Sequence, residues 1–570
     1  MAVMTRHLDD FSGRIRFIAV LLFIFAGILV YRLFDLQVIS ASYWQDKASH
    51  QYVASQPESS IANRGTIYFR EKNNQIVSAA AIKEGFSAVI NPSTLKNPEE
   101  VYDKISSVIP IEREEFLRQA KKENDSFEII SRRLEAEKAE ALKKMAIIGL
   151  NIIPEEWRFY PGENLASHVL GFVGYKNNDL VGQYGIEKSF EDFLKGTSED
   201  ALRSSFTEAF LGVSREIFLF SPYNKKDVIL TIEPSVQGFL ERALEKILEK
   251  YSAESAGGII IEPETGKILA MAAKPDFDPN FYNKVKNPGL FLNPLVSNFF
   301  EMGSVFKPIT ISSAIDAGRI NSQTTYFDSG SLTIDKYEIK NYDEQARGKV
   351  NIQTVLNKSL NTGAVFAMRQ LGKDNFRDYV TSFGLGEKTG IELPDEIRGD
   401  ISGLKSPREV EYATASFGQG IALTPLGFTA AFSVLANGGK LVQPYIIENG
   451  ENKPIIKREV LKKETSEEIT RMLVKVVDEA LLGGSVKIEH YSIAAKTGTA
   501  QIPLENKKGY DENMYLHAFV GYAPAFDAKF LAFLYLKKPQ GVRYAAYSLT
   551  PAFMDITKFL LNYYEVPPDR

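Results

Sequence analysis

The chain has 570 residues, too many for one ordinary hydrophobic core, and this length predicts two or three domains. Its formal net charge of −5 argues against nucleic acid as the main partner. The sequence contains no cysteine, which excludes disulfides, thiolate metal sites and a cysteine nucleophile. The five histidines show no metal-ligand spacing, so we expect no metal and no cofactor.

An apolar run near the N-terminus predicts a membrane anchor. Residues 17–34 are uncharged except for Arg32, and as a helix they would span about 27 Å, close to the hydrocarbon thickness of a bilayer. Arginines precede the run, which favours a cytoplasmic N-terminus. A buried core helix or a cleaved signal peptide is the alternative, but no small-x-small cleavage site follows the run. We therefore expect a cytoplasmic tail at residues 1–14 and an uncleaved transmembrane helix at 15–36. The rest of the chain should lie outside the cytoplasm, at the inner or plasma membrane.

Residues 37–225 are expected to form a mixed α/β domain. Short alternating segments at 65–69 and 86–90 predict strands, and a charge-rich stretch at 112–145 predicts helix. The mixture of Arg, Lys and Glu in that stretch is typical of a solvated helix face and not of a nucleic-acid site.

A second domain is expected at residues 226–570, where strands stand at both ends with helices between them. The expected strands are residues 228–232, 257–261, 267–271, 491–495, 517–522 and 530–535. A helix follows Pro234, mostly helical sequence covers 304–440, and a last helix begins near Ala552. This order predicts an α+β fold in which distant segments close one antiparallel sheet around an all-helical insert.

Ser304 and Lys307 are the first candidate catalytic pair. Ser304 directly follows Gly303, and Pro308 is tolerated only in the first turn of a helix, so a helix should begin at or near Ser304. The positive end of that helix favours negative charge on the hydroxyl, and Lys307 lies about one turn further on the same face. A lysine acts as a base only if burial or a nearby positive charge, such as Lys496, populates its neutral form. By itself this string is more typical of a helix-capping serine and a solvated lysine.

Ser359 and Asn361 form the second candidate motif. They lie in an amphipathic helical segment that begins at Asn351 and should end near Thr362-Gly363. Ser359 could pass a proton between Lys307 and a leaving amine, and the Asn361 amide could hold a substrate backbone. Helix-end capping by small polar residues explains the same pattern, so this motif is weak alone.

Lys496-Thr-Gly-Thr499 is the third candidate motif and should end a strand. Gly498 permits close backbone approach, so an extended peptide could pair along this edge. The N–H groups of Ser304 and Thr499 would form an oxyanion hole, and Lys496 with the hydroxyls of Thr497 and Thr499 could bind a carboxylate. A simple turn after an edge strand is the alternative.

The order of the three motifs is more specific than any one of them. Similar strings occur elsewhere in the chain: Ser93/Lys96, Ser402/Lys405 and Lys388-Thr-Gly390. Lys388 lies in turn-rich sequence without a preceding strand, and only one ordered selection places all three motifs in suitable contexts. That selection indicates a serine acyl-transfer enzyme that uses lysine to activate its nucleophile.

With these residues in place, nearly the whole chain resembles a class B penicillin-binding protein, a peptidoglycan D,D-transpeptidase. Besides the motifs, the resemblance rests on Arg64-Gly65, Arg158-x-Tyr160-Pro161, Gly182 to Glu187, Asn293 to Ser297, Ser416 to Gly420, Thr424-Pro425 and Ala523-Pro524. The first three segments resemble the family's N-terminal pedestal, or dimerisation, domain. Two departures are visible: Met302 stands where the family usually has proline, and Phe69 and Lys72 replace the usual Asp and Gly.

The resemblance implies a penicillin-binding transpeptidase domain with a five-stranded antiparallel sheet. It implies that Ser304 attacks the penultimate D-Ala carbonyl of a D-Ala-D-Ala stem peptide, that D-Ala leaves, and that an amine from a neighbouring strand resolves the acyl-enzyme into a crosslink. β-Lactams would inhibit the enzyme. Its expected partners are a polytopic peptidoglycan glycosyltransferase and division proteins, contacted through the anchor and pedestal.

The segment Lys496-Thr-Gly-Thr-Ala-Gln501 resembles the septal, division-type branch of the family. Three alternatives stay open: an elongation-type transpeptidase, a catalytically idle scaffold of the division machinery, and a hydrolase or receptor for β-lactams. A receptor of that type should have several membrane spans, and one is expected here.

Overall fold

The computed structural model describes residues 4–35, 61, 64–122, 125–177, 179–196, 226–448, 454–504 and 509–570. Packing divides the chain into two units, Met1–Ala62 with Lys83–Trp157, and Asn63–Ile82 with Arg158–Arg570. The predicted domain boundaries near residues 36 and 225 lie outside the described residues and stay predictions. All the candidate catalytic residues belong to the larger unit.

The N-terminal helix α1 (Met4–Phe34) contains the predicted apolar span. Residues Phe17–Phe34 have a mean hydropathy of 2.5, and none of this stretch is buried by the rest of the chain. Among the described helices, this one alone is long and apolar enough to cross a membrane.

The smaller unit contains α3 (Pro98–Ser106), α4 (Arg113–Ala120), β3 (Glu128–Leu134) and α5 (Ala136–Lys144), packed around apolar side chains such as Ile105 and Phe116. Strands β2 (Ile76–Ile90) and β4 (Leu150–Phe159) pass from this unit into the larger one. The prediction of continuous helix at 112–145 is wrong because β3 interrupts it. Ile129 and Ile130 favour a strand, and β3 pairs with the end of β2.

The first elements of the larger unit are short, and in the sequence they precede and follow the Lys83–Trp157 segment of the smaller unit. These are β1 (Ile67–Arg70), α6 (Ser167–Leu170), β5 (Val173–Lys176), β6 (Asp179–Gly182), α7 (Gly185–Ser189), α8 (Glu191–Lys195) and β7 (Val228–Leu230). β1 pairs with the start of β2 and, in parallel, with β7, where Ile67 lies opposite Val228.

A buried ionic cluster joins these segments. Arg64 Nε donates to Glu187 Oε2 at 2.7 Å, Arg158 Nε donates to Glu187 Oε1 at 2.6 Å, and the Tyr160 hydroxyl donates to Oε1 at 3.2 Å. Burial alone would raise the pKa of Glu187, but the charges of Arg158 and Arg64 outweigh it and hold that pKa below its usual value. Three of the sequence segments that carry the family resemblance therefore meet at one carboxylate.

A five-stranded antiparallel sheet forms the centre of the larger unit, in the order β16-β17-β18-β8-β9. Its strands are β8 (Ser255–Ile261), β9 (Ile268–Lys274), β16 (Ala494–Pro503), β17 (Tyr510–Ala523) and β18 (Phe530–Lys537). Distant segments close the sheet as predicted, because β18 pairs with β8 and Leu531 lies opposite Ile261.

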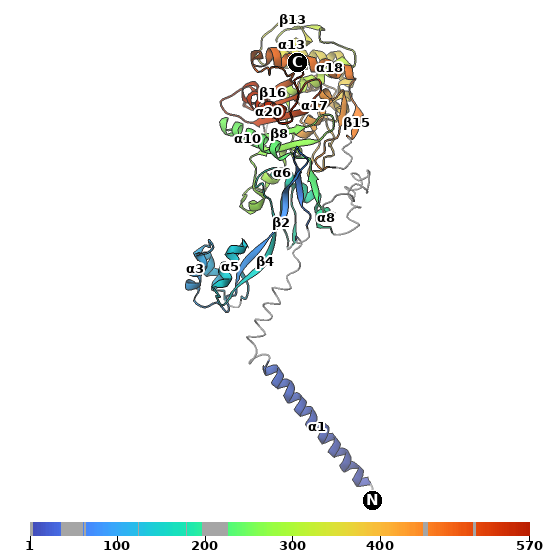
Figure 1. The fold of residues 1–570 in the computed structure, drawn as a ribbon. Coiled ribbons are helices and arrows are strands. Elements are labelled where there is room, and N and C mark those ends of the chain that lie inside the picture. The colour runs from blue at the N-terminus through green and yellow to red at the C-terminus, as the bar shows by residue number, and fades with distance from the viewer. Residues whose placement is uncertain are drawn as a thin grey trace. The chain divides into compact units, whose positions relative to one another are not determined.

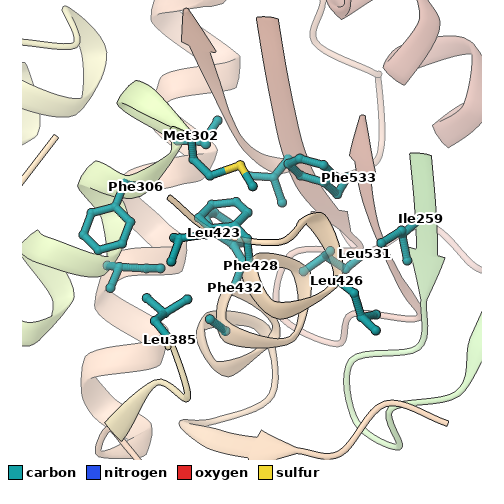
Figure 2. Close-up of a cluster of buried hydrophobic side chains, with 14 of the residues drawn as sticks. Ile259, Met302, Phe306, Leu385, Leu423, Leu426, Phe428, Phe432, Leu531 and Phe533 are labelled. Carbon is teal, nitrogen blue, oxygen red and sulfur yellow. The ribbon is translucent and has the colours of Figure 1, made fainter. Parts of the chain in front are cut away.

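The two faces of the sheet bury different helices, because side chains alternate along each strand. On one face Phe519 and Phe530 pack with α10 (Pro234–Lys250) and α20 (Thr550–Tyr563), which lie together in Figure 1. On the other face Leu531 and Phe533 pack with Phe428 of α17 (Pro425–Ala436), as Figure 2 shows. Both faces of the sheet are therefore buried against helices.

The remaining described elements lie mainly between β9 and β16. They are η4 (Pro279–Lys284), η5 (Pro288–Phe291), α11 (Pro294–Ser297), η6 (Gly303–Phe306), α12 (Lys307–Asp316), β10 (Thr325–Asp328), β11 (Ser331–Ile334), β12 (Tyr337–Lys340), β13 (Gly348–Asn351), α13 (Ile352–Asn357), α14 (Asn361–Leu371), α15 (Lys373–Ser382), η7 (Ser402–Lys405), α16 (Glu409–Ala415), β14 (Lys440–Val442), β15 (Ile456–Glu459), α18 (Lys463–Lys475), η8 (Val476–Ala480) and η9 (Leu481–Gly484); α19 (Ala545–Ser548) precedes α20. The predicted insert is therefore not entirely helical. Two small sheets, β10–β13 and β11–β12, interrupt it, and Gly330 with φ 81° lets the chain turn between β10 and β11.

Replacing Glu187 by glutamine tests the ionic cluster. Because two buried guanidinium groups would lose their anion, we expect Glu187→Gln to lower the free energy of unfolding by about 3–5 kcal/mol. The folded-state pKa of Glu187 is lowered, so its contribution is present at neutral pH and disappears as the pH falls through that value. Chemical denaturation of the detergent-solubilised protein, followed by circular dichroism, measures the change.

The neighbouring Lys188 supplies the control. Its exposed ion pair with Asp395 should be worth less than about 1 kcal/mol, so Lys188→Met should change the unfolding curve little. Equal effects of the two substitutions would contradict the assigned importance of the cluster.

Candidate active site

The candidate nucleophile lies on a tight turn that leads into a helix. Ser304 is in η6, and α12 begins at Lys307 directly behind it, in agreement with the prediction. Gly303 has φ 61°, a left-handed conformation that favours glycine, and its N–H donates to the Gly418 carbonyl at 3.0 Å. A Cβ on Gly418 would lie 2.3 Å from the Gly303 oxygen, so this approach requires glycine. The Gly418 segment thus fixes the turn that carries Ser304.

Lys307 is fully buried, and its amine contacts both candidate serines. Its Nζ lies 2.9 Å from Ser304 Oγ, 2.5 Å from the Ser359 carbonyl oxygen and 3.2 Å from Ser359 Oγ. Burial first, and the charge of Lys496 second, lower the pKa of Lys307 well below its usual value. Both effects favour the neutral form of the amine beside the Ser304 hydroxyl, and the lone pair of that form can accept the serine proton.

Lys496 contacts the same serine hydroxyl as Lys307, that of Ser359. It is 2% exposed, and its Nζ donates to Ser359 Oγ at 3.1 Å and to its neighbour's carbonyl, Thr497 O, at 2.9 Å. Burial lowers the pKa of Lys496 to about 7. Its positive charge is therefore present below pH 7 and fades above it.

Ser359 lies between two helices and not within one. α13 ends at Asn357 and α14 begins at Asn361, so the prediction of a single segment ending near residue 363 is wrong. Ser359 has φ 53°, a conformation that L-residues rarely adopt, and both its carbonyl and its hydroxyl contact Lys307. The apolar periodicity continues through this break, which explains why the sequence pattern did not reveal it.

The third motif lies inside strand β16 and not at its end as predicted, because β16 continues to Pro503. β16 is an edge strand of the sheet. A Cβ on Gly498 would lie 2.8 Å from the Met302 oxygen and 3.0 Å from the Val305 nitrogen. The edge strand therefore passes in direct contact with the turn that bears Ser304, and the pairing of a peptide along this edge stays a prediction.

The polar side chains around this edge are held by neighbouring backbone groups. Thr499 Oγ1 accepts a hydrogen bond from Ala545 N at 3.0 Å, which leaves its hydroxyl hydrogen for another acceptor. Asn361 Nδ2 donates to Lys340 O at 2.7 Å. Thr497, like these two residues, is only partly buried, so its side chain is accessible from solvent.

Three distant segments thus form one continuous hydrogen-bonded path. Ser304 Oγ, Lys307 Nζ, Ser359 Oγ and Lys496 Nζ each lie within 3.2 Å of the next. A proton can move along such a path without meeting bulk water. The competing strings do not join it: Ser402 and Lys405 lie in η7, and the Thr389 hydroxyl donates to Glu396 at 2.6 Å.

The residues that depart from the family pattern make defined contacts in the structure. Met302 is 1% exposed and points into the apolar cluster near Phe533 (Figure 2), so it anchors the nucleophile turn by packing. Phe69 is buried in the core, and Lys72 donates to the carbonyl oxygen of Tyr563 at 2.7 Å.

Comparison with known families identifies this arrangement. Residues 256–558 match the penicillin binding protein transpeptidase domain, and residues 59–203 match the penicillin-binding protein dimerisation domain. The chain belongs to the class B penicillin-binding proteins, whose C-terminal domain is a serine transpeptidase. The predicted fold class and enzyme class are confirmed.

The chain is similar to several curated proteins along most of its length. It is 29% identical to "Stage V sporulation protein D" of Bacillus subtilis over 94% of this chain and 83% of that protein. It is 28% identical to "Peptidoglycan D,D-transpeptidase FtsI" of Buchnera aphidicola subsp. Schizaphis graminum, covering 96% and 95% of the two chains. It is 30% identical to "Probable peptidoglycan D,D-transpeptidase PbpC" of Pseudomonas aeruginosa, covering 78% of each.

Solved structures share the fold. Penicillin Binding Protein 2X from Streptococcus thermophilus superposes with a TM-score of 0.69 at 20% identity, over 89% of this chain and 81% of that one. Penicillin binding protein 3 from Mycobacterium tuberculosis, complexed with aztreonam, superposes with a TM-score of 0.65 at 22% identity, over 89% and 98%.

The sequence reasoning missed Asn341, which contacts the second motif, and Asp328, which contacts Asn341. Asn341 accepts hydrogen bonds from the backbone of Asn361 and Thr362, and Asp328 accepts one from the Asn341 amide. Neither belongs to a recognised string, and a contact across 20 residues leaves no periodic signal in the sequence.

Replacing Lys496 by methionine tests the electrostatic link between the two lysines. Because the charge of Lys496 depresses the pKa of Lys307, its removal should raise that pKa, so Lys307 stays protonated to higher pH. In Lys496→Met the acid limb of the acylation rate against pH should therefore shift to higher pH. Stopped-flow measurement with a fluorescent penicillin gives the profile.

The matched control is Lys457→Met. Burial also lowers the pKa of Lys457, but its Nζ donates to the carbonyl oxygen of Thr389, outside the path of the two serines. This variant should keep the wild-type profile. An unchanged acid limb in Lys496→Met would contradict the electrostatic link.

Proposed function

We propose that this chain is a membrane-anchored peptidoglycan D,D-transpeptidase in which Ser304 is the nucleophile and Lys307 the general base. The observation that carries the proposal is the contact of one buried amine, Lys307 Nζ, with both Ser304 Oγ and Ser359 Oγ. Lysine can take the role that histidine has in other serine acyl-transfer enzymes where its pKa is lowered, as burial and the charge of Lys496 lower it here.

The reaction begins when Ser304 Oγ attacks the penultimate D-Ala carbonyl of a D-Ala-D-Ala stem peptide. The serine proton passes to Lys307 Nζ as the new C–O bond forms. Ser359 relays that proton to the amine of the terminal D-Ala, whose C–N bond breaks. An acceptor amine from a neighbouring strand then attacks the acyl-serine, restores the Ser304 proton and completes the crosslink.

The other motif residues bind the substrate in this scheme. The N–H groups of Ser304 and Thr499 stabilise the tetrahedral oxyanion, a role supported by the close approach of β16 to the nucleophile turn. Lys496 with Thr497 and Thr499 binds the terminal carboxylate, and the Asn361 amide holds the peptide backbone. β16 is an edge strand, so an extended peptide can pair along it.

The first test is covalent labelling with a fluorescent penicillin. The detergent-solubilised protein should form one stable adduct, and Ser304→Ala should abolish it because Ser304 Oγ is the proposed attacking group. Ser402→Ala is the matched control, since Ser402 has the same spacing to a lysine and should leave labelling intact. Gel fluorescence and intact mass measure the adduct.

Two outcomes separate the alternatives. An adduct that is released within seconds to minutes would identify a β-lactam hydrolase. A folded wild-type protein without a Ser304-dependent adduct would favour the idle scaffold and overturn the proposed mechanism.

We further propose a septal role, with a polytopic glycosyltransferase and division proteins as partners, and a cytoplasmic N-terminus. The apolar span of α1 and the arginines that precede it support the topology. The Lys-Thr-Gly-Thr-Ala-Gln segment and the similarity to a protein named FtsI support division over elongation.

The septal role predicts where the protein acts in the cell. A fluorescent fusion should concentrate at midcell, and depletion should produce filaments, because elongation continues while septation stops. A Ser304→Ala fusion should localise in the same way but fail to restore division. Lateral-wall localisation with rounded cells would assign the protein to elongation instead.

A further inference from the structure

The helix that carries Asn361 begins without a capping side chain of its own. Leu360 stands at the N-cap position of α14 and has no polar side chain, so the first backbone N–H groups need another acceptor. Asn341 supplies it from 20 residues upstream: its Oδ1 accepts from Asn361 N at 2.9 Å and from Thr362 N at 3.2 Å. Asn341 is 1% exposed, so this cap is sheltered from water.

A buried carboxylate fixes the orientation of the Asn341 amide. Asn341 Nδ2 donates to Asp328 Oδ1 at 2.9 Å, and a carboxylate can face only the NH₂ end of an amide. Asp328 is fully buried and also accepts from Thr362 Oγ1 at 2.8 Å. Its Oδ2 lies 3.7 Å from Arg347 Nη1, which supplies a positive charge. The Asn341 carbonyl is thereby directed at the start of α14.

The residue next to this helix start is strained. Ser359 adopts φ 53°, which costs a residue with a Cβ about 1–2 kcal/mol and persists only where the flanking chain is fixed. On its N-terminal side Ser359 N donates to Leu356 O at 3.3 Å, and on its C-terminal side Leu360 N donates to Val355 O at 3.0 Å. The following residue, Asn361, is held by the Asn341 cap.

The segment that contains Asn341 also holds the side chain of Asn361. Asn361 Nδ2 donates to the carbonyl oxygen of Lys340, the residue directly before Asn341. Lys340 and Asn341, at the end of β12, therefore hydrogen-bond to both the side chain and the backbone of Asn361. Asn361 lies two residues after Ser359.

We propose that Asn341, oriented by Asp328, is a positioning residue that holds Ser359 and Asn361 in the geometry needed for acylation. The inference rests on the proposed function, because it assigns Asn341 an effect through those two residues and not through contact with substrate. Without the cap, the start of α14 can fray and Ser359 can relax to an ordinary backbone conformation. Its carbonyl and hydroxyl would then leave the Lys307 amine.

The test compares Asn341→Leu with the double exchange Asn341→Asp/Asp328→Asn. Leucine removes both the cap and the amide donor. The exchange keeps a capping oxygen on residue 341 and one amide–carboxylate hydrogen bond, now donated from position 328. The measurement is the single-turnover acylation rate constant at saturating fluorescent penicillin, with the final amount of adduct recorded separately.

We expect the rate constant of Asn341→Leu to fall roughly 10- to 100-fold, the size expected for a misplacement of about 1 Å, and the double exchange to recover most of that loss. A purely structural role would reduce the amount of active protein and so the final adduct, but not the rate constant of the molecules that react. A wild-type rate constant in Asn341→Leu, or a loss confined to the final adduct, would overturn the proposal.

Asn437→Leu is the matched control. Asn437 is also a buried asparagine, with its Nδ2 donating to Pro263 O at 2.9 Å and to Lys440 O at 2.8 Å, and it contacts none of the motif residues. It should lower the thermal midpoint without changing the acylation rate constant. Failure of the proposed function itself would appear separately, as the absence of a Ser304-dependent adduct in the wild-type protein.

Discussion

Burial disfavours the charged form of the Lys307 amine, and the proposed chemistry of the site depends on this effect. Lys274 shows the contrast, because it is also buried yet pairs with Asp276 at 2.6 Å and Glu245 at 3.1 Å. Burial alone would lower the pKa of Lys274, but its carboxylates raise it, whereas the described surroundings of Lys307 offer hydroxyl and carbonyl oxygens and the like charge of Lys496. The choice of neighbours therefore decides whether a buried lysine is an ion-pair partner or a base.

Such a base has to be enclosed by segments that would not meet without the rest of the fold. The sheet edge β16 and the segment at Gly418 each approach the turn before α12 at distances that exclude ordinary side chains. Gly498 and Gly418 permit these approaches, and Ser359 adopts a strained backbone at the same place. The apolar layers on both faces of the sheet supply the stability that offsets these local costs.

The fold was accessible from sequence where the signal is local or periodic. The first strands of the sheet follow from apolar β-branched runs, the helix start at Ser304 from Pro308, and the apolar span of residues 17–34 from its length. Errors arose where tertiary contacts override a local pattern: β3 divides the stretch at 112–145, and two small sheets divide the insert. β3 and β10 are stable because strands distant in the sequence pair with them, whereas β11 and β12 form a local hairpin that the sequence reasoning missed.

The sequence by itself determined which residue types are available and in what order, and that was enough for the family and for Ser304, Lys307 and Lys496 as candidates. Only the tertiary structure decided that Lys307 is buried and that the Ser359 hydroxyl contacts the amines of both Lys307 and Lys496. It also decided that Asn341 caps the helix that begins at Asn361. The physical reason is that pKa values and backbone strain depend on surroundings contributed by segments far apart in the chain. Burial and hydrogen-bond partners are properties of the folded molecule, and residue spacing does not encode them.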